Sequence, residues 1–444
     1  MGLDTPPTTG RRCPGETNPV GPELRNSAPV TTLSPSLIML ASALVMGLAT
    51  ACQLVAPRLR IPSLILLLPA GLLLGAAAPQ LRFDAILGNA FPVAVDLIVA
   101  VILFHGGLSL SQSTLRNPDR GVVRRLVWVG APITWIAGAV AAHYLLGLSW
   151  SLAFMLGAIL VVSGPTVVTP ILNFARPKGR VGGILQWEGT LLDPLGALLA
   201  VVVFQVVKAS GATSLSEAAA LFFGGLFIGI AAALVGVVLF VLGGRLANGD
   251  KLLGTQVLLG SVIVTAGLAN YVANESGLIA ALLMGLVAPR IARRFGASLT
   301  EADPFFNAVV TIGIGVLFVA IAALVPIRDV LAILGPTLAL GLVLVLLVRP
   351  VVALLSTSGA GLTTRERTFI AWMDPRGIVA AATASSIGAA LVALKLPGAE
   401  KLLPATFIII AFTVGLYGLT AVPVAKALKL RQGSDADASS DHAG

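Results

Sequence analysis

The residues with the clearest capacity for chemistry form the stretch Trp187-Glu188-Gly189-Thr190-Leu191-Leu192-Asp193-Pro194. It lies inside an apolar run from about residue 181 to 207, which is long enough to cross a bilayer as a helix. A carboxylate at membrane depth costs roughly 2.5–3.5 kcal/mol on insertion scales, so it is kept where it faces protein, water or an ion. At 100° per residue, Glu188 and Asp193 lie about 140° apart and need not share a partner. We expect Asp193 to bind a transported ion and Glu188 to hold the scaffold together; the alternative is that neighbours neutralise both.

The composition predicts a polytopic helical membrane protein. Of the 444 residues, 57% are hydrophobic and 11% charged, and the mean hydropathy is +0.96. No zinc spacing, phosphate loop or nucleotide fingerprint occurs, so we expect neither a cofactor nor a nucleic-acid partner. Cys13 and Cys52 make no disulfide framework. An intramembrane enzyme would need a nucleophile–base pair or a metal cluster, and the sequence offers no such set.

The apolar runs divide the chain into a disordered segment 1–34, a transmembrane domain 35–430 and a polar tail 431–444. We expect thirteen transmembrane helices, at about 36–55, 61–77, 90–110, 124–147, 150–174, 181–207, 216–244, 252–271, 274–289, 304–325, 330–355, 366–393 and 403–427. With this count, most Lys and Arg residues fall in loops on one side, which predicts a cytoplasmic C-terminus and an outside N-terminus. The basic residues of the opposite loops are Arg82, Lys208, Arg328, Lys395 and Lys401.

Two of the expected helices carry breaks. Gly164, Pro165 and Pro170 interrupt the fifth, and Asp374-Pro375-Arg376-Gly377 interrupts the twelfth. Unwound backbone at membrane depth is tolerated where it is buried or lines a cavity. If 36–207 and 252–427 are two repeats, the broken fifth and twelfth helices are counterparts. They are seven spans apart, and because this number is odd the two repeats have opposite orientations in the membrane. Interrupted helices at matching places in inverted halves indicate a transporter's binding site.

Arg376 is always charged and lies at membrane depth, so it needs a carboxylate from Glu188, Asp193 or Asp374. We favour Glu188, which forms a structural ion pair with Arg376 and leaves Asp193 free. A desolvated, unpaired aspartate can hold either a proton or a monovalent cation, and competition for it is sufficient for antiport. Hydroxyls of Ser163, Thr166 and Thr190 and freed carbonyls are oxygen ligands for such a cation; the alternative for Ser163 and Thr166 is bonding back to their own helix.

Three stretches resemble the monovalent cation:proton antiporters of the NhaP and eukaryotic sodium/proton exchanger type. They are Ser-Gly-Pro-Thr-Val-Val-Thr-Pro (163–170), Trp-Glu-Gly-Thr-Leu-Leu-Asp-Pro (187–194) and Pro-Arg-Gly-Ile-Val-Ala-Ala (375–381). A fourth, Phe-His-Gly-Gly-Leu (104–108), looks like the family's Phe-Glu-Gly-Gly-Leu with His105 in place of the acid. Two further departures are Leu192, where the family usually has Asn or Asp, and Gly164, where an acid is common.

The resemblance implies a thirteen-helix fold of inverted repeats, with a dimer domain and a core domain that moves like an elevator. It implies two broken helices that cross, Asp193 as the ion- and proton-binding residue, and Glu188 paired with Arg376. Ser163 matches a threonine that contributes an oxygen at the crossing.

The sequence therefore predicts an antiporter in the plasma membrane, with a homodimer implied by the resemblance. It would exchange protons for Na⁺ or Li⁺ bound at Asp193. A K⁺/H⁺ antiporter with the same site, or a cation channel, are the alternatives. One titratable carboxylate favours electroneutral one-for-one exchange.

Overall fold

The computed structural model describes residues 35–59, 61–79, 86–88, 90–112, 117–209, 214–247, 250–294 and 303–431. The predicted segment 1–34, and the predicted tail beyond Arg431, lie outside these residues. The regular secondary structure of these residues is helical, apart from an isolated β-bridge between Pro177 and Arg431. The prediction of an all-helical protein is confirmed.

The helices of the first half precede residue 209 and those of the second half follow residue 214. The first set is α1 (Pro35–Leu59), α2 (Leu64–Ala77), α4 (Ala90–Gln112), α5 (Asn117–Arg125), η2 (Leu126–Gly130), α6 (Ala131–Leu146), α7 (Trp150–Val161), α8 (Pro165–Ala175) and α9 (Val181–Lys208). The second set is α10 (Leu215–Leu246), α11 (Lys251–Val272), α12 (Ser276–Arg294), α13 (Asp303–Ala323), α14 (Ile327–Val343), η3 (Leu344–Val348), α15 (Arg349–Thr357), α16 (Thr364–Trp372), α17 (Ile378–Ala393), η4 (Ala399–Lys401) and α18 (Leu402–Ala427).

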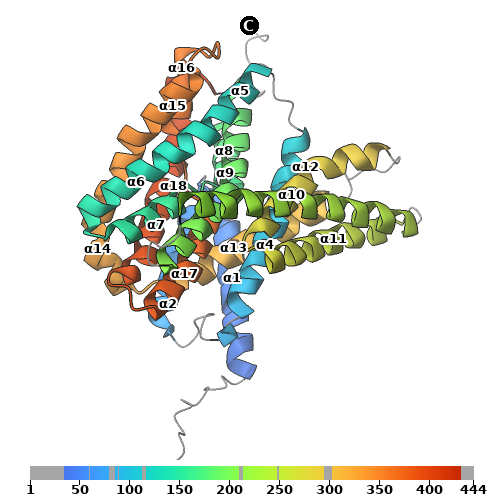
Figure 1. Ribbon diagram of the computed structural model, residues 1–444, viewed down its shortest axis with the longest axis horizontal. Coiled ribbons are helices and arrows are strands. Elements are labelled where there is room, and N and C mark those ends of the chain that lie inside the picture. The colour runs from blue at the N-terminus through green and yellow to red at the C-terminus, as the bar shows by residue number, and fades with distance from the viewer. Residues whose placement is uncertain are drawn as a thin grey trace, which may run out of the picture.

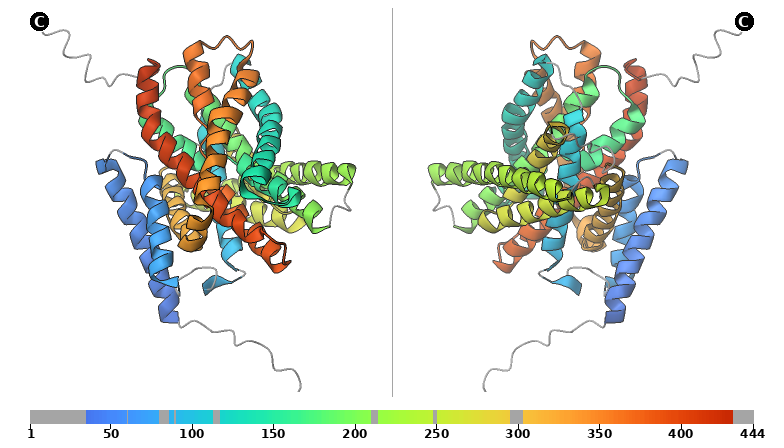
Figure 2. Two further views of the ribbon diagram at one scale, coloured as in Figure 1. Left: turned by 90° about the vertical axis from the view of Figure 1, so that its left-hand side faces the viewer. Right: turned by 90° about the vertical axis from the view of Figure 1, so that its right-hand side faces the viewer.

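These helices pack as two bundles. The first contains α1, α2, α4 and α10–α13, and the second contains α5–α9 and α14–α18. Figure 1 shows α6, α14 and α15 of the second bundle on the left and α10, α11 and α12 of the first on the right. Figure 2 shows α1 and α2 together at one edge of the molecule. The bundles meet where α4 packs against α8, α9 and α17, so residues there can line a path between them.

Nine of the described helical stretches are long and apolar enough to cross a membrane, or ten if α7 and α8 form one bent span. The chain is thus a polytopic helical membrane protein, as predicted. Helix appears in every one of the thirteen predicted ranges. The count by length is smaller because α2, α17 and the Ser276–Ala292 part of α12 are apolar but short, and because α16 and α17 are separate helices.

Two of the long helices contain a five-residue π-helical turn. The turn η2 joins α5 to α6, and η3 joins α14 to α15. The two regions pack together, because α15 contacts η2 and a Cβ atom on Gly130 would lie 2.6 Å from Val352 Cγ1. Such turns shift the register of the residues that follow and are frequent at functional sites. Here Arg349 follows η3 directly.

Candidate cation-binding site

The two interrupted helices break where the sequence predicts. The first break separates α7, which ends at Val161, from α8, which begins at Pro165, and the two helices are bent by 45°. Proline suits the first position of a helix because its missing N–H has no partner there in any case. The second break separates α16 from α17, and residues 373–377 between them have no helical structure.

The two breaks contact each other through their smallest residues. Ser163 Oγ donates a hydrogen bond to the Pro375 carbonyl oxygen at 3.0 Å. A Cβ atom on Gly377 would lie 3.1 Å from both the N and the Cα of Gly164. Glycine at both positions therefore allows the extended segments to cross backbone to backbone, and Ser163 joins them rather than bonding back to its own helix.

Asp193 of α9 lies directly beside this crossing. It is 0% exposed, and neither carboxylate oxygen has a hydrogen-bond partner among the described residues. A Cβ atom on Gly164 would lie 2.7 and 2.9 Å from the two oxygens. Gly164 thus leaves room for the carboxylate, and an acid at this position would occupy that space. A buried charge without a partner is costly, so this carboxylate requires a proton or a cation.

Further oxygen atoms lie around the crossing. The Thr166 hydroxyl is buried and unpaired within the described chain, and a Cβ atom on Gly377 would lie 3.4 Å from it. Thr190, in contrast, donates to the Gln186 carbonyl oxygen at 2.7 Å, so its hydroxyl proton is used within α9. Ser163 and Thr166 therefore escape the helix bonding that was their alternative role, and Thr190 does not.

Pro170 does not break its helix, contrary to the prediction. It lies inside α8, which continues to Ala175. A proline at this position has no N–H to donate to the carbonyl oxygen four residues earlier, which is that of Thr166. Pro194 inside α9 leaves the Thr190 carbonyl oxygen without that bond for the same reason. Both prolines free carbonyl oxygens near the crossing without ending a helix.

The predicted ion pair between Glu188 and Arg376 is wrong. Glu188 pairs instead with Arg349, whose two terminal nitrogens donate to the two carboxylate oxygens at 2.5 and 2.9 Å. Both side chains are buried, and Arg349 Nε donates to the Ile370 carbonyl oxygen at 3.0 Å. The pair therefore ties α9 to α15 and to α16. Arg349 lies within the predicted span 330–355, but it was not among the partners that we considered for Glu188.

Arg376 pairs with Asp374, its neighbour in the broken segment, at 2.9 Å. The cause is local, because the two residues lie two positions apart in the non-helical segment 373–377. Arg376 Nη1 also donates to the Val161 carbonyl oxygen at 3.4 Å, at the last residue of α7. A cation at a helix C-terminus offsets the negative end of the helix dipole. Arg376 and Asp374 therefore stabilise the crossing itself.

A cavity of about 320 Å³ leads to the crossing from one side. Its walls come from α4, α8, α9 and α13, and its polar residues include His105, Ser109, Thr166, Asn173, Gln186 and Asn307. His105 Nε2 lies 3.4 Å from Asp303 Oδ1 on the first turn of α13. Thr166 lines this cavity and also lies beside the crossing, so the cavity ends close to the site, although Asp193 itself is buried behind its wall.

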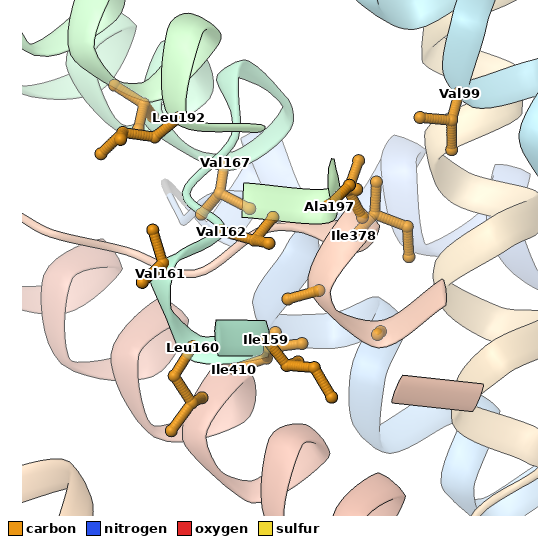
Figure 3. Packing of buried hydrophobic residues seen from close by; sticks show 14 of the residues in the cluster. Val99, Ile159, Leu160, Val161, Val162, Val167, Leu192, Ala197, Ile378 and Ile410 are labelled. Atoms are coloured by element: carbon orange, nitrogen blue, oxygen red, sulfur yellow. The ribbon is translucent and has the colours of Figure 1, made fainter. Parts of the chain in front are cut away.

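Elsewhere the crossing is sealed by apolar side chains. Figure 3 shows Val161, Val162 and Val167 gathered with Leu192 and Ile378 around the point where the broken segments meet. All five are buried. Such packing excludes water around the crossing and strengthens electrostatic interactions there.

This geometry defines a class: a helical membrane transporter whose broken helices cross beside a buried carboxylate. Residues 40–427 match the family model described as "Sodium/hydrogen exchanger, transmembrane". The chain belongs to this family, so it is a monovalent cation/proton antiporter and not an enzyme. The resemblance stated from the motifs is confirmed.

Individual relatives share about a quarter of their residues with this chain. The K⁺/H⁺ antiporter NhaP2 of Shewanella sp. (strain MR-4) is 26% identical over 405 residues, which is 88% of this chain and 67% of that protein. The Na⁺/H⁺ antiporter NhaH of Halobacillus dabanensis is 24% identical over 404 residues, covering 87% of this chain and 96% of the relative. The solved structure of the sodium proton antiporter MjNhaP1 from Methanocaldococcus jannaschii at pH 8 superposes with a TM-score of 0.74 at 22% identity. The superposition covers 88% of this chain and 99% of the MjNhaP1 chain. It supports the same overall fold for the two proteins.

Proposed function

We propose that the protein exchanges one proton for one monovalent cation at Asp193. The observation that carries this proposal is a fully buried carboxylate with both oxygens unpaired within the described chain. Protonated, the group is neutral; deprotonated, it needs a cation of one charge. Proton and cation therefore exclude one another at a single group, and a one-for-one exchange moves no net charge.

The cation is bound by oxygens around the crossing. The Asp193 carboxylate, the Thr166 hydroxyl and the carbonyl oxygens freed by Pro170 and Pro194 are hard ligands suited to an alkali cation. Ser163 contributes by joining the two breaks, with its proton donated to Pro375 and its oxygen lone pairs still available. Sodium, lithium and potassium all fit this chemistry. The site residues alone favour none of them, and the relatives named above include antiporters of both sodium and potassium.

The architecture supports thirteen spans arranged as inverted repeats. The helices that carry η2 and η3 are the fourth and eleventh predicted spans, and the broken helices are the fifth and twelfth. The broken helices are separated by seven spans and support the internal symmetry; the π-helical turns add nothing to it, because η2 follows nine helical residues and η3 follows seventeen. We place the N-terminus outside and the C-terminus in the cytoplasm from the distribution of basic residues.

Alternating access would follow from movement between the two bundles. Asp193 lies in the second bundle and the cavity that leads to it has walls from both, so sliding of one bundle past the other can close that cavity. The first bundle would be the fixed dimer domain. Its α10 exposes Phe227 and Leu234, which are 70% and 65% exposed and suit lipid or a second copy.

The test uses inside-out membrane vesicles with an acid interior and a pH-sensitive dye. Addition of Na⁺, Li⁺ or K⁺ should release protons through the native protein, and Asp193→Asn should reduce the signal to that of vesicles without it. Asp329→Asn, a change at an exposed acid on α14, is the matched control and should behave as native. The ion that gives the response identifies the substrate, and exchange by Asp193→Asn at the native rate would contradict the proposal.

Two further outcomes concern stoichiometry and mechanism. Proton efflux that changes with an imposed membrane potential would contradict the one-for-one stoichiometry, and cation flux without proton return would indicate a channel.

A further inference from the structure

A second and much smaller cavity, with room for about one water molecule, lies farther along the bundle interface. The same helix, α4, lines both cavities. Asp96 and Val99 face the second cavity, while His105 and Ser109 face the first. Asp96 and His105 are nine residues apart, which is ~13 Å along a helix axis. The two cavities therefore follow one another along α4.

Two carboxylates from different helices face each other in the second cavity. Asp96 comes from α4, and Glu275 directly precedes α12. Both are half-buried, and both line this one small cavity. Neither has a hydrogen bond or an ion pair with any described residue, and no described Lys, Arg or His lines this cavity. Like charges in a poorly hydrated space require a proton or a cation between them.

A buried hydroxyl from the opposite bundle completes the set. Thr383 of α17 is 4% exposed and lines the cavity, and its hydroxyl has no hydrogen-bond partner among the described residues. Buried threonines of the neighbouring α18 behave differently, because Thr406 and Thr413 donate to the carbonyl oxygen four residues earlier. Thr383 instead leaves its hydroxyl free to bind a ligand in the cavity. The exposed Ser386 lies one turn farther along the same helix.

The position of Glu275 is fixed by its neighbours. Its backbone is left-handed, with φ of 66°, which is uncommon for a residue with a side chain. Ser276 Oγ donates to the carbonyl oxygens of Ala269 and Ala273, and the Gly277 N–H donates to Asn270 Oδ1 at 2.7 Å. These bonds hold the turn between α11 and α12, so the Glu275 carboxylate is presented to the cavity at a fixed place.

We propose that Asp96, Glu275 and Thr383 form a second site that binds a monovalent cation in exchange for a proton. The two carboxylates hold one proton between them in the absence of the cation and release it when the cation binds. Since the ligands come from both bundles, the site would form and open as the bundles move. It would recruit cations at the face opposite the large cavity. Its role in transport rests on the proposed exchange at Asp193, but binding at the site does not.

The binding test removes the central site first. Purified Asp193→Asn protein in weakly buffered detergent solution is titrated with NaCl or KCl, with choline chloride as the reference, and released protons are followed with an indicator dye. We expect proton release that saturates with Na⁺ or K⁺.

The additional change Glu275→Gln or Asp96→Asn should remove this proton release, while Asp329→Asn in the same background should leave it unchanged. Size-exclusion elution and thermal unfolding identify any variant that fails to fold, and Thr383→Val, which keeps the shape of the side chain, should weaken binding about tenfold.

Three outcomes would overturn this second site. They are the absence of cation-dependent proton release from Asp193→Asn, equal release with and without Glu275→Gln, and a response to Mg²⁺ but to neither Na⁺ nor K⁺. The transport arm uses Glu275→Gln in the otherwise native protein, where the KM for the cation supplied at that face should rise about tenfold. An unchanged KM would remove the site from the transport path. If the native protein exchanges no cation at all, the proposed function fails while the binding result still stands.

Discussion

Glu188 and Asp193 lie on the same helix, five residues apart, and both are buried, yet their surroundings are opposite. Glu188 has both oxygens bound by Arg349, whereas those of Asp193 have no partner within the described chain. The rotation of a helix separates the two carboxylates, so one faces the π-helical region of the second bundle and the other faces the crossing.

The difference separates a structural charge from a transport charge. A carboxylate with a fixed counter-ion stays ionised and cannot exchange its partner with the solvent. A carboxylate with no fixed partner must take one from solution, and whichever ion it takes can be replaced. The predictions below test this contrast, beginning with the largest expected effect.

Glu188→Gln should destabilise the protein far more than Asp193→Asn. Removal of one member of a buried pair leaves the other charge uncompensated, at a cost of about 3–5 kcal/mol. Arg349 would be that charge, because its remaining bond, to the neutral Ile370 carbonyl oxygen, does not neutralise it. Thermal unfolding of both variants in detergent measures the effect.

A double change provides the control for this prediction. Glu188→Leu with Arg349→Met replaces the pair by apolar side chains of similar length and should recover most of the stability lost in Glu188→Gln. Equal unfolding temperatures for Glu188→Gln and Asp193→Asn would remove the distinction between the two carboxylates.

Gly164→Ala should weaken cation binding without unfolding the protein. Gly164 has extended backbone, with φ of −125° and ψ of 152°, so alanine meets no backbone strain. Its Cβ atom would instead displace the Asp193 carboxylate from its place, since the two oxygens lie 2.7 and 2.9 Å away. A displacement of about 1 Å at a reacting group can cost on the order of a hundredfold. The apparent affinity for the cation in the vesicle assay measures it.

Gly224→Ala is the matched control, because it adds a Cβ atom on α10 where no atom lies within 4 Å. It should leave cation affinity at the native value and make α10 more stable, as alanine is favoured over glycine in helices by about 0.5–1 kcal/mol. A Gly164→Ala protein with native affinity would show that Gly164 does not set the position of Asp193.

The sequence predicts the helices and the breaks well because both follow from local properties. Apolar runs mark the helices, and Gly164-Pro165 and Pro375-Arg376-Gly377 mark the breaks. The partner of Glu188 was missed because it depends on a π-helical turn, η3, which has no sequence signal that we recognised and which directly precedes Arg349. Glycine at position 164 is explained by its contact with Asp193. The acid that His105 replaces is supplied from another helix by Asp303. Both explanations depend on tertiary contacts, so the motifs alone do not reveal them.

Pro170→Ala should weaken cation binding by a smaller amount. Alanine restores an N–H that can donate to the Thr166 carbonyl oxygen, which then becomes a poorer ligand for a cation. A hydrogen bond of this kind is worth about 1 kcal/mol, so affinity should fall roughly fivefold while α8 becomes more stable. Pro336→Ala, at a proline inside α14 that lines neither cavity, should stabilise its helix with no change in affinity. Unchanged cation affinity in Pro170→Ala would mean that the Thr166 carbonyl oxygen is not a ligand.

Asp303→Asn should have the smallest effect, because its pair with His105 is more exposed to solvent than either Glu188 or Asp193. Asp303 is 45% exposed and His105 is 16% exposed, and the two atoms lie 3.4 Å apart. Such a pair contributes at most about 1 kcal/mol and only while His105 is protonated. Thermal unfolding should therefore show a small loss of stability at a pH acid enough to protonate His105, and none at pH 8, where the imidazole is neutral. Added salt should shrink the loss in Asp303→Asn and leave the loss in Glu188→Gln unchanged, because salt screens exposed charges and hardly reaches buried ones. An equal response of both variants to salt would place Glu188 in the same solvent-accessible class as Asp303 and contradict its role as a fixed, buried charge.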